Sequence, residues 1–157
     1  MKEHTYNVTV NWEGNAGDGT SSYTAYKRNF SAQVQGKPTL LGSADPAFRG
    51  DAERWNPEDM LVASLSACHK LWYLHLCAVN AVNMLEYVDH AEGRMVEADE
   101  LRKGHFTEVV LRPQIIVSAD SDLELARRLH EDAHYECFLA NSVSFPVRCA
   151  PSIKPSC

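Results

Sequence analysis

Five cysteines are the residues of this 157-residue chain best suited to chemistry, and Cys68 is the first candidate among them. A cysteine is commonly a small buried hydrophobic residue, and it becomes a nucleophile only where its thiolate is stabilised. Cys68 falls about 11 residues, or roughly 16 Å, into a predicted helix, which is beyond the reach of the helix dipole. A neighbouring cation must therefore stabilise the thiolate, and the loop before the helix offers Arg49 and Arg54. An arginine suits this role because it stays charged when buried.

The other cysteines differ in how well they could pair with Cys68. Cys137 stands at the end of a second predicted helix, and its position permits it to meet Cys68 across the helix pair. Cys77 is about half a turn round the helix from Cys68, so it is predicted to be a core residue. Cys149 and Cys157 lie near the C-terminal end and are predicted to be incidental. An odd number of cysteines in a reducing compartment favours core residues, ligands or reactive thiols over a disulfide framework.

A second pattern lies at residues 130–134, His-Glu-Asp-Ala-His, which matches the H-E-x-x-H pattern of zinc proteases. On a helix, His130 and His134 share a face and could bind one metal ion, with Glu131 activating a water molecule. The further glycine and histidine of the longer metzincin pattern do not follow. Three fixed positions are also easily matched by chance, so exposed helix residues are the competing interpretation.

A mixed zinc site is a third arrangement that the sequence permits. Cys68 and His75 lie on nearly one face of the first helix, and His134 and Cys137 are close in sequence on the second. Two cysteines and two histidines could form a closed tetrahedral site. The short Cys-x-x-Cys spacing typical of structural zinc is absent, which argues against it.

The elements that must position these residues begin with strands. Residues 6–12 alternate apolar and polar side chains, and residues 22–34 have the composition of a strand. Turn residues at 15–20 and 36–38 punctuate them, which predicts an N-terminal antiparallel meander. Residues 43–56 form a polar loop long enough to be functional.

A long helix is predicted to begin at Pro57. Asn56 is a plausible N-cap, and Glu58 and Asp59 favour the positive end of the helix dipole. Apolar residues then surround the helix nearly completely up to residue 79, which predicts a buried centre of the fold. A second helix at residues 122–136 is predicted, with Asp120 or Ser121 as its cap.

Strand-like segments at residues 86–97, 106–118 and 141–148 complete the chain. The order of elements predicts an α+β fold, with antiparallel sheets packed around a long central helix and a second helix, in a single domain of residues 1–157. A buried helix of roughly 20 residues is hard to cover with one chain of this size, so we expect a second subunit to cover part of it.

Composition excludes several classes of function. The net charge of −6, the pI near 5.6 and the absence of a Lys/Arg run argue against nucleic-acid binding. No apolar segment follows the first basic residue, so no secretory signal is expected. The longest apolar stretch contains His69, Lys70 and His75, which disfavours a membrane span. The sequence therefore predicts a soluble cytoplasmic protein.

Two blocks carry a family resemblance: Asn56-Pro-Glu-Asp-Met-Leu-Val-Ala-Ser-Leu-Ser-Ala-Cys68, and His134-Tyr-Glu-Cys137-Phe-Leu-Ala-Asn141-Ser. Together they resemble the osmotically inducible protein C and organic hydroperoxide resistance (OsmC/Ohr) family. The order of elements agrees with that family over essentially the whole chain. The resemblance implies an intertwined homodimer with active sites at the subunit interface.

The resemblance also implies an activity, that of a thiol-dependent peroxidase acting on organic hydroperoxides. At the matching positions of this chain, the resemblance implies that Cys68 is the peroxidatic thiol, which forms a sulfenic acid. It implies that Cys137 is the resolving thiol, which closes a disulfide. Glu58 is the acidic partner of the activating arginine. The reductant is a dithiol such as a lipoylated protein, and no metal or organic cofactor is expected.

The chain also departs from the family pattern. His69 follows the candidate nucleophile where an apolar residue is more usual, and His75 lies on a nearby face. Arg49 fits the family's arginine segment better than Arg54, so Arg49 is our choice. Two other functions stay open at this point: a zinc-dependent hydrolase using residues 130–134, and a non-catalytic redox sensor in which Cys68 oxidises without turnover.

Overall fold

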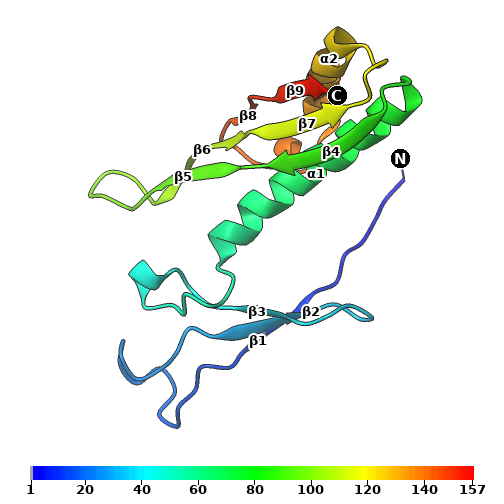
Figure 1. Ribbon diagram of the computed structural model, residues 1–157. Helices are drawn as coiled ribbons and strands as arrows, with labels where there is room; N and C mark the ends of the chain where they lie inside the picture. Colours follow the sequence, from blue (N-terminus) through cyan, green and yellow to red (C-terminus); the bar gives the residue numbers. More distant parts are fainter. Residues whose placement is uncertain (1) are drawn as a thin grey trace. The chain divides into compact units, whose positions relative to one another are not determined.

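The computed structural model describes residues 2–157, and the chain divides into two compact units, Met1–Met60 and Leu61–Cys157. Each unit is described by itself (Figure 1). The first unit contains the predicted meander, a sheet in the order β1(Thr9–Trp12)–β2(Phe30–Gln33)–β3(Leu40–Gly42). Both pairings are antiparallel, which confirms the prediction, although the strands are shorter than predicted and β3 was not expected. The short helix η1(Pro46–Phe48) lies in the loop that follows.

Helix α1(Pro57–Val79) begins as predicted. The side chain of Asn56 accepts a hydrogen bond from the backbone N–H of Asp59 at 2.7 Å, as an N-cap should. Within the single chain α1 is buried on one side only, so the burial of its other faces by a second subunit stays a prediction. Only one row of α1 side chains is buried, at four-residue intervals, while Leu71 and Val79 are more than 60% exposed. This buried row consists of Leu65, His69, Tyr73 and Cys77.

The second unit contains a long bent hairpin. Each of the two strands predicted here is divided into two, giving β4(Met84–Asp89) and β5(Glu92–Val96) on one side. β6(His105–Leu111) and β7(Pro113–Val117) form the other side. At the break, the carboxylate of Asp89 accepts a hydrogen bond from the backbone N–H of Arg112 at 2.7 Å. A partly buried carboxylate contact thus replaces the strand ladder where the hairpin bends.

Helix α2(Leu123–Glu136) follows β7, and its N-cap is Asp122, which accepts from the backbone N–H groups of Glu124 and Leu125. The cap is therefore one or two residues later than predicted. After η2(Ala140–Ser142), β8(Val147–Cys149) pairs with β6 and β9(Ser152–Pro155) pairs with β7, both in parallel. The sheets are therefore mixed, because a helical crossover returns the chain in the same direction.

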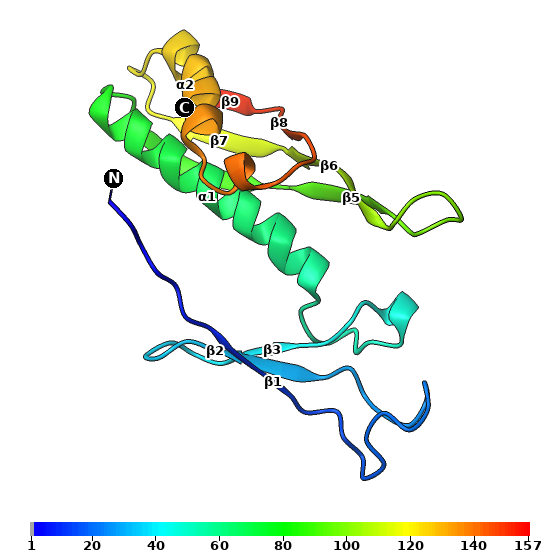
Figure 2. The same cartoon turned by 180° about the vertical axis from the view of Figure 1, so that it is seen from behind.

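The strands of the second unit form two sheets, in the orders β4–β7–β9 and β5–β6–β8. Both helices pack on the same face of the sheet β4–β7–β9 (Figure 2). One core cluster joins α1 and α2 to β7 and β9, and a smaller cluster joins the N-terminal half of α1 to β6. The α+β fold with two helices that the sequence predicts is confirmed, although the two sheets of the second unit are mixed and not purely antiparallel as predicted. Among the described residues, no helix is both long enough and apolar enough to cross a membrane.

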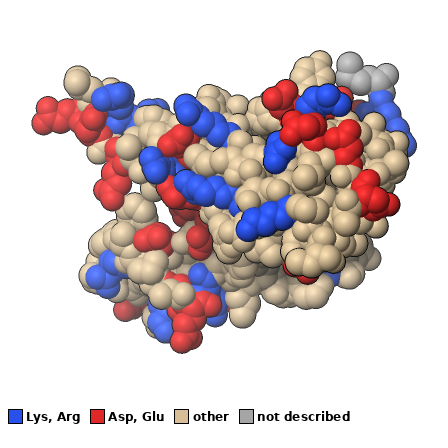
Figure 3. Space-filling model, turned by 45° about the horizontal axis from the view of Figure 1, so that its top comes forward, with Lys and Arg blue, Asp and Glu red and all other residues tan. Residues whose placement is uncertain are grey.

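Charges of both signs are mixed on the face seen in Figure 3, where basic and acidic side chains lie next to one another. Within the second unit, Arg94 forms an ion pair with Glu108, and Arg112 forms one with Glu92.

Candidate functional site

Cys68 and Cys137 lie close together in the second unit. Cys68 is in the middle of α1, and Cys137 caps the C-terminal end of α2, where its backbone N–H reaches the carbonyl of His134. Cys137 is 1% exposed, and its sulfur accepts a hydrogen bond from the backbone N–H of Ala140 at 3.5 Å. Burial, with a contribution from the neighbouring Cys68 thiol, raises the pKa of the Cys137 thiol to about 11. The helix pair therefore positions the two cysteines as neighbours.

Apolar side chains flank the two cysteines. Trp72 is four residues after Cys68 and so shares its face of α1, and Phe138 directly follows Cys137. The rings of Trp72 and Phe138 meet edge to face with centroids 5.5 Å apart. The ring of His75, which is exposed, also lies edge to face with Trp72, with centroids 5.9 Å apart. The surroundings of the two thiols are thus aromatic.

Cys137 is expected to react slowly with iodoacetamide in the native reduced protein. Because its pKa is raised to about 11, the neutral thiol persists to high pH. At pH 8 we expect a thiolate fraction about 10²-fold below that of an ordinary cysteine, with a rate that rises about tenfold per pH unit. Mass spectrometry of peptides alkylated between pH 7 and 10 measures this, with the exposed Cys157 as the internal control. Equal rates at the two cysteines would contradict a buried Cys137 thiol.

The predicted arginines and Glu58 belong to the first unit. Arg54 forms ion pairs with Glu13 at 3.5 Å and Asp51 at 3.6 Å. Arg49 has a left-handed backbone, with φ of 64°, and its exposed guanidinium lies 5.7 Å from the ring centroid of Tyr23. Because Cys68 belongs to the other unit, the pairing of an arginine with its thiolate stays a prediction.

The two histidines of the H-E-x-x-H pattern have different surroundings. His134 is exposed, but His130 is 4% exposed, so the expectation of exposed residues fails for His130. Nε2 of His69 and Nδ1 of His130 are 3.0 Å apart. Burial lowers the pKa of His69 to about 4, with a contribution from His134, and that of His130 to about 3. Both rings are therefore neutral at pH 7.

Cys149, which the sequence analysis predicted to be incidental, is the third member of this group. Its sulfur lies 3.5 Å from Nε2 of His69 and 3.7 Å from Nδ1 of His130. Burial, followed by the charge of Asp89, raises the pKa of the Cys149 thiol to about 12. Among residues 2–157, these three are the only histidine, cysteine and acidic side chains whose ligand atoms converge as a metal site would require. The pattern at residues 130–134 and the set of Cys68, His75, His134 and Cys137 do not converge in this way.

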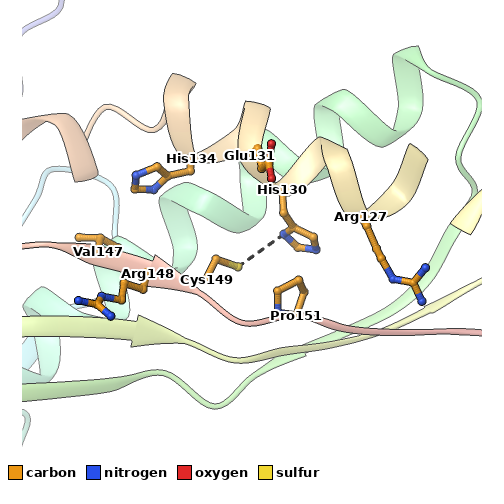
Figure 4. Close-up of a pocket in the computed structure, with 8 residues that line it drawn as sticks. All are labelled: Arg127, His130, Glu131, His134, Val147, Arg148, Cys149 and Pro151. Carbon is orange, nitrogen blue, oxygen red and sulfur yellow. Dashed lines mark hydrogen bonds between the residues drawn. The ribbon is translucent and has the colours of Figure 1, made fainter. Parts of the chain in front are cut away.

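A hollow of about 380 Å³ opens beside this group (Figure 4). Cys149 and His130 lie on its wall with their reactive atoms turned toward each other, while His134 extends away from them. Arg127 and Arg148 stand at its edges. The sequence did hold one signal for this group, because His69 is a polar residue at a position where an apolar residue is more usual in the family that the chain resembles.

The chain resembles known proteins throughout its length. The model of the OsmC-like protein family matches residues 50–151. An OsmC-like protein of unknown function from Vibrio cholerae is 30% identical, with a TM-score of 0.84, and the match covers 97% of this chain and 100% of the other. No curated protein matches the chain.

More distant structures share the fold. An organic hydroperoxide resistance protein OsmC from Legionella pneumophila is 18% identical with a TM-score of 0.67, and the match covers 97% of this chain and 99% of the other. The organic hydroperoxide resistance protein OhrB of Bacillus subtilis is 16% identical with a TM-score of 0.62, and the match covers 95% and 98%. Since the family model covers both cysteine blocks and the Vibrio protein aligns over 97% of the chain, this chain belongs to the OsmC-like protein family.

Proposed function

We propose that this protein is a thiol-dependent peroxidase that reduces organic hydroperoxides through Cys68 and Cys137. The observation that carries the proposal is the proximity of these two thiols at the centre of an OsmC-like fold. Cys68 is partly accessible and Cys137 is buried, which fits an attacking thiol and a resolving thiol, respectively. Two fold relatives named organic hydroperoxide resistance proteins support the substrate class.

The reaction runs in three steps. The Cys68 thiolate attacks one peroxide oxygen, so that an S–O bond forms, the O–O bond breaks and the alcohol leaves after taking up a proton. The Cys137 thiol then attacks the Cys68 sulfenic acid, which forms the disulfide and releases water. An external dithiol reduces the disulfide by thiol–disulfide exchange and is itself oxidised. A lipoylated protein is the reductant that we propose.

The aromatic pair of Trp72 and Phe138 supports an apolar peroxide. A carbon chain or ring gains from contact with these side chains, whereas hydrogen peroxide has no apolar part to bury. We therefore expect the protein to prefer cumene hydroperoxide over hydrogen peroxide.

The direct test is the consumption of cumene hydroperoxide by the reduced protein with dihydrolipoamide as reductant. We expect sustained turnover, and one Cys68–Cys137 disulfide per chain when the reductant is left out, detected by peptide mass spectrometry. In Cys137→Ser the first oxidation should proceed without this disulfide. A single oxidation of Cys68 with no turnover under any dithiol would instead indicate a redox sensor and overturn the peroxidase proposal.

Arg49 is the residue that we propose stabilises the Cys68 thiolate, with Glu58 holding the guanidinium. Arg54 already pairs with Glu13 and Asp51, whereas Arg49 has no acidic partner among the described residues. Replacing Arg49 with alanine should remove the charge that stabilises the Cys68 thiolate, and so slow both its alkylation and its attack on peroxide about tenfold or more at pH 7. The measurement is the pH dependence of Cys68 alkylation in Arg49→Ala and Arg54→Ala. A greater loss of rate in Arg54→Ala would reverse the assignment.

We also propose that both units form one domain and that the protein works as a homodimer. Apolar side chains exposed on α1 and β1, such as Leu71 at 61% and Val10 at 63%, are candidates for burial by a partner. Sedimentation equilibrium at micromolar concentration should give twice the chain mass, and a monomeric mass would contradict this proposal. The five free thiols and the dithiol reductant fit the cytoplasm, where we place the protein.

A further inference from the structure

We propose that His69, His130 and Cys149 form a binding site for a zinc ion, separate from the Cys68–Cys137 pair. The family resemblance implied no metal, so this site goes beyond the proposed peroxidase function and does not depend on it. The three residues come from α1, α2 and β8, and all lie in the second unit.

The distances between the three ligand atoms carry the proposal. In a tetrahedral zinc site with Zn–N near 2.0–2.1 Å and Zn–S near 2.3 Å, two nitrogens are about 3.3 Å apart and a nitrogen and a sulfur about 3.6 Å. The corresponding distances here are 3.0 Å between the nitrogens, and 3.5 and 3.7 Å from the sulfur to each nitrogen. The three atoms are therefore already placed around a point that an ion of this size would occupy.

Ligand chemistry favours zinc over calcium or magnesium. Two imidazoles and one thiolate are ligands for zinc and other first-row transition metals, whereas calcium and magnesium require oxygen ligands. The carboxylate of Asp89 lies near enough to raise the pKa of Cys149, so a dication would gain from its charge as well. Asp89 is itself held by the Ser66 hydroxyl and the Arg112 backbone N–H.

Through the hollow in Figure 4 an ion could reach the site from solvent, and a water molecule in the hollow could be its fourth ligand. His130 and Cys149 line it, whereas His69 lies deeper at 1% exposure. Three protein ligands with the fourth position open to solvent is the pattern of zinc sites that bind a water molecule or a small substrate. An ion here would join α1, α2 and the C-terminal strands and would also expose one coordination position to the hollow.

Co²⁺ is the probe that tests the site, because a tetrahedral Co²⁺–thiolate complex has visible d–d bands and a sulfur-to-metal charge-transfer band. The reduced, metal-free protein is titrated with Co²⁺, and Zn²⁺ is then added. We expect one Co²⁺ per chain with both kinds of band, and their loss when Zn²⁺ displaces Co²⁺. A titration of the wild-type protein without a charge-transfer band would overturn the proposal, and this readout needs no variant that might unfold.

Variants then identify the ligands. Cys149→Ser, which nearly preserves side-chain volume, should lose the charge-transfer band and weaken Zn²⁺ binding by about tenfold or more in competition with a chromophoric chelator. Cys157→Ser and Cys68→Ser, which lie outside the site, should bind as the wild type does. Unchanged binding in Cys149→Ser, or loss of binding in Cys68→Ser, would overturn the assignment.

A last variant separates this site from the H-E-x-x-H pattern. His134→Ala removes the exposed histidine of that pattern and should leave Zn²⁺ affinity and the Co²⁺ spectrum unchanged. Loss of both in His134→Ala, with Cys149→Ser binding normally, would place the metal at residues 130–134 and refute the site proposed here. Circular dichroism of each variant confirms that it is folded before the comparison.

Discussion

Replacing Cys68 with serine is expected to reduce hydroperoxide turnover by about 10³-fold or more, to the level of the uncatalysed reaction. The physical reason is that a serine hydroxyl is almost fully protonated at neutral pH and is a far weaker nucleophile than a thiolate. The substitution changes one atom in the middle of α1 and preserves the size of the side chain. The measurement is steady-state consumption of cumene hydroperoxide with dihydrolipoamide in excess.

Two other cysteines of the chain are matched controls for this experiment. Cys157→Ser removes an exposed thiol, and Cys77→Ser removes a thiol that is 2% exposed in the core. Neither is predicted to take part, so both should keep turnover within about twofold, provided that Cys77→Ser is folded. Full turnover in Cys68→Ser, or its loss in Cys157→Ser, would show that another thiol carries the reaction.

Local signals in the sequence predicted the elements that hold this site. Asn56, Pro57 and the two acidic residues after them set the start of α1, because a cap and a dipole act within one turn. The same kind of signal placed α2 to within one or two residues. The two cysteine blocks then placed Cys68 and Cys137 on these helices, and the structure brings the two thiols together.

The group of His69, His130 and Cys149 could not be predicted in the same way. His69 is 61 positions from His130 and 80 from Cys149, and His130 is 19 positions from Cys149. These separations are too large for a local sequence pattern to join the three residues. The apolar residues of α1 surround the helix and do not single out the row that faces the sheet. That row is chosen by packing against β6, β7 and α2, which is a tertiary property.

The ends of the strands could not be predicted either, because they too depend on contacts between residues far apart in the sequence. The composition of residues 106–118 predicts one strand, but the strand is interrupted at Arg112. There the carboxylate of Asp89 accepts a hydrogen bond from the backbone N–H of Arg112. The partner in that contact is 23 positions away. The parallel pairing of β8 and β9 likewise depends on where α2 returns the chain, which the composition of these short strands does not reveal.

Replacing Tyr73 with alanine is expected to lower the free energy of unfolding by about 3–5 kcal/mol. Tyr73 is 0% exposed and belongs to the core cluster that joins α1 and α2 to β7 and β9. Its hydroxyl donates a hydrogen bond to the carbonyl of Ala126 in α2 at 3.0 Å, and its ring stacks on His130 with centroids 3.8 Å apart. The substitution therefore leaves a cavity, removes the hydrogen bond and withdraws support from the His130 ring. Urea unfolding with reductant present measures the loss.

Two further variants resolve that effect into its parts. Tyr73→Phe keeps the ring and removes only the hydroxyl, so it should cost about 1 kcal/mol. Leu74→Ala changes the next residue of the same helix, which is 40% exposed, and should cost less than about 1 kcal/mol. If Tyr73→Ala cost no more than Leu74→Ala, the packing of α1 against α2 described here would be wrong. If Tyr73→Phe alone accounted for the whole loss, the hydrogen bond to Ala126, rather than the volume of the ring, would hold the two helices together.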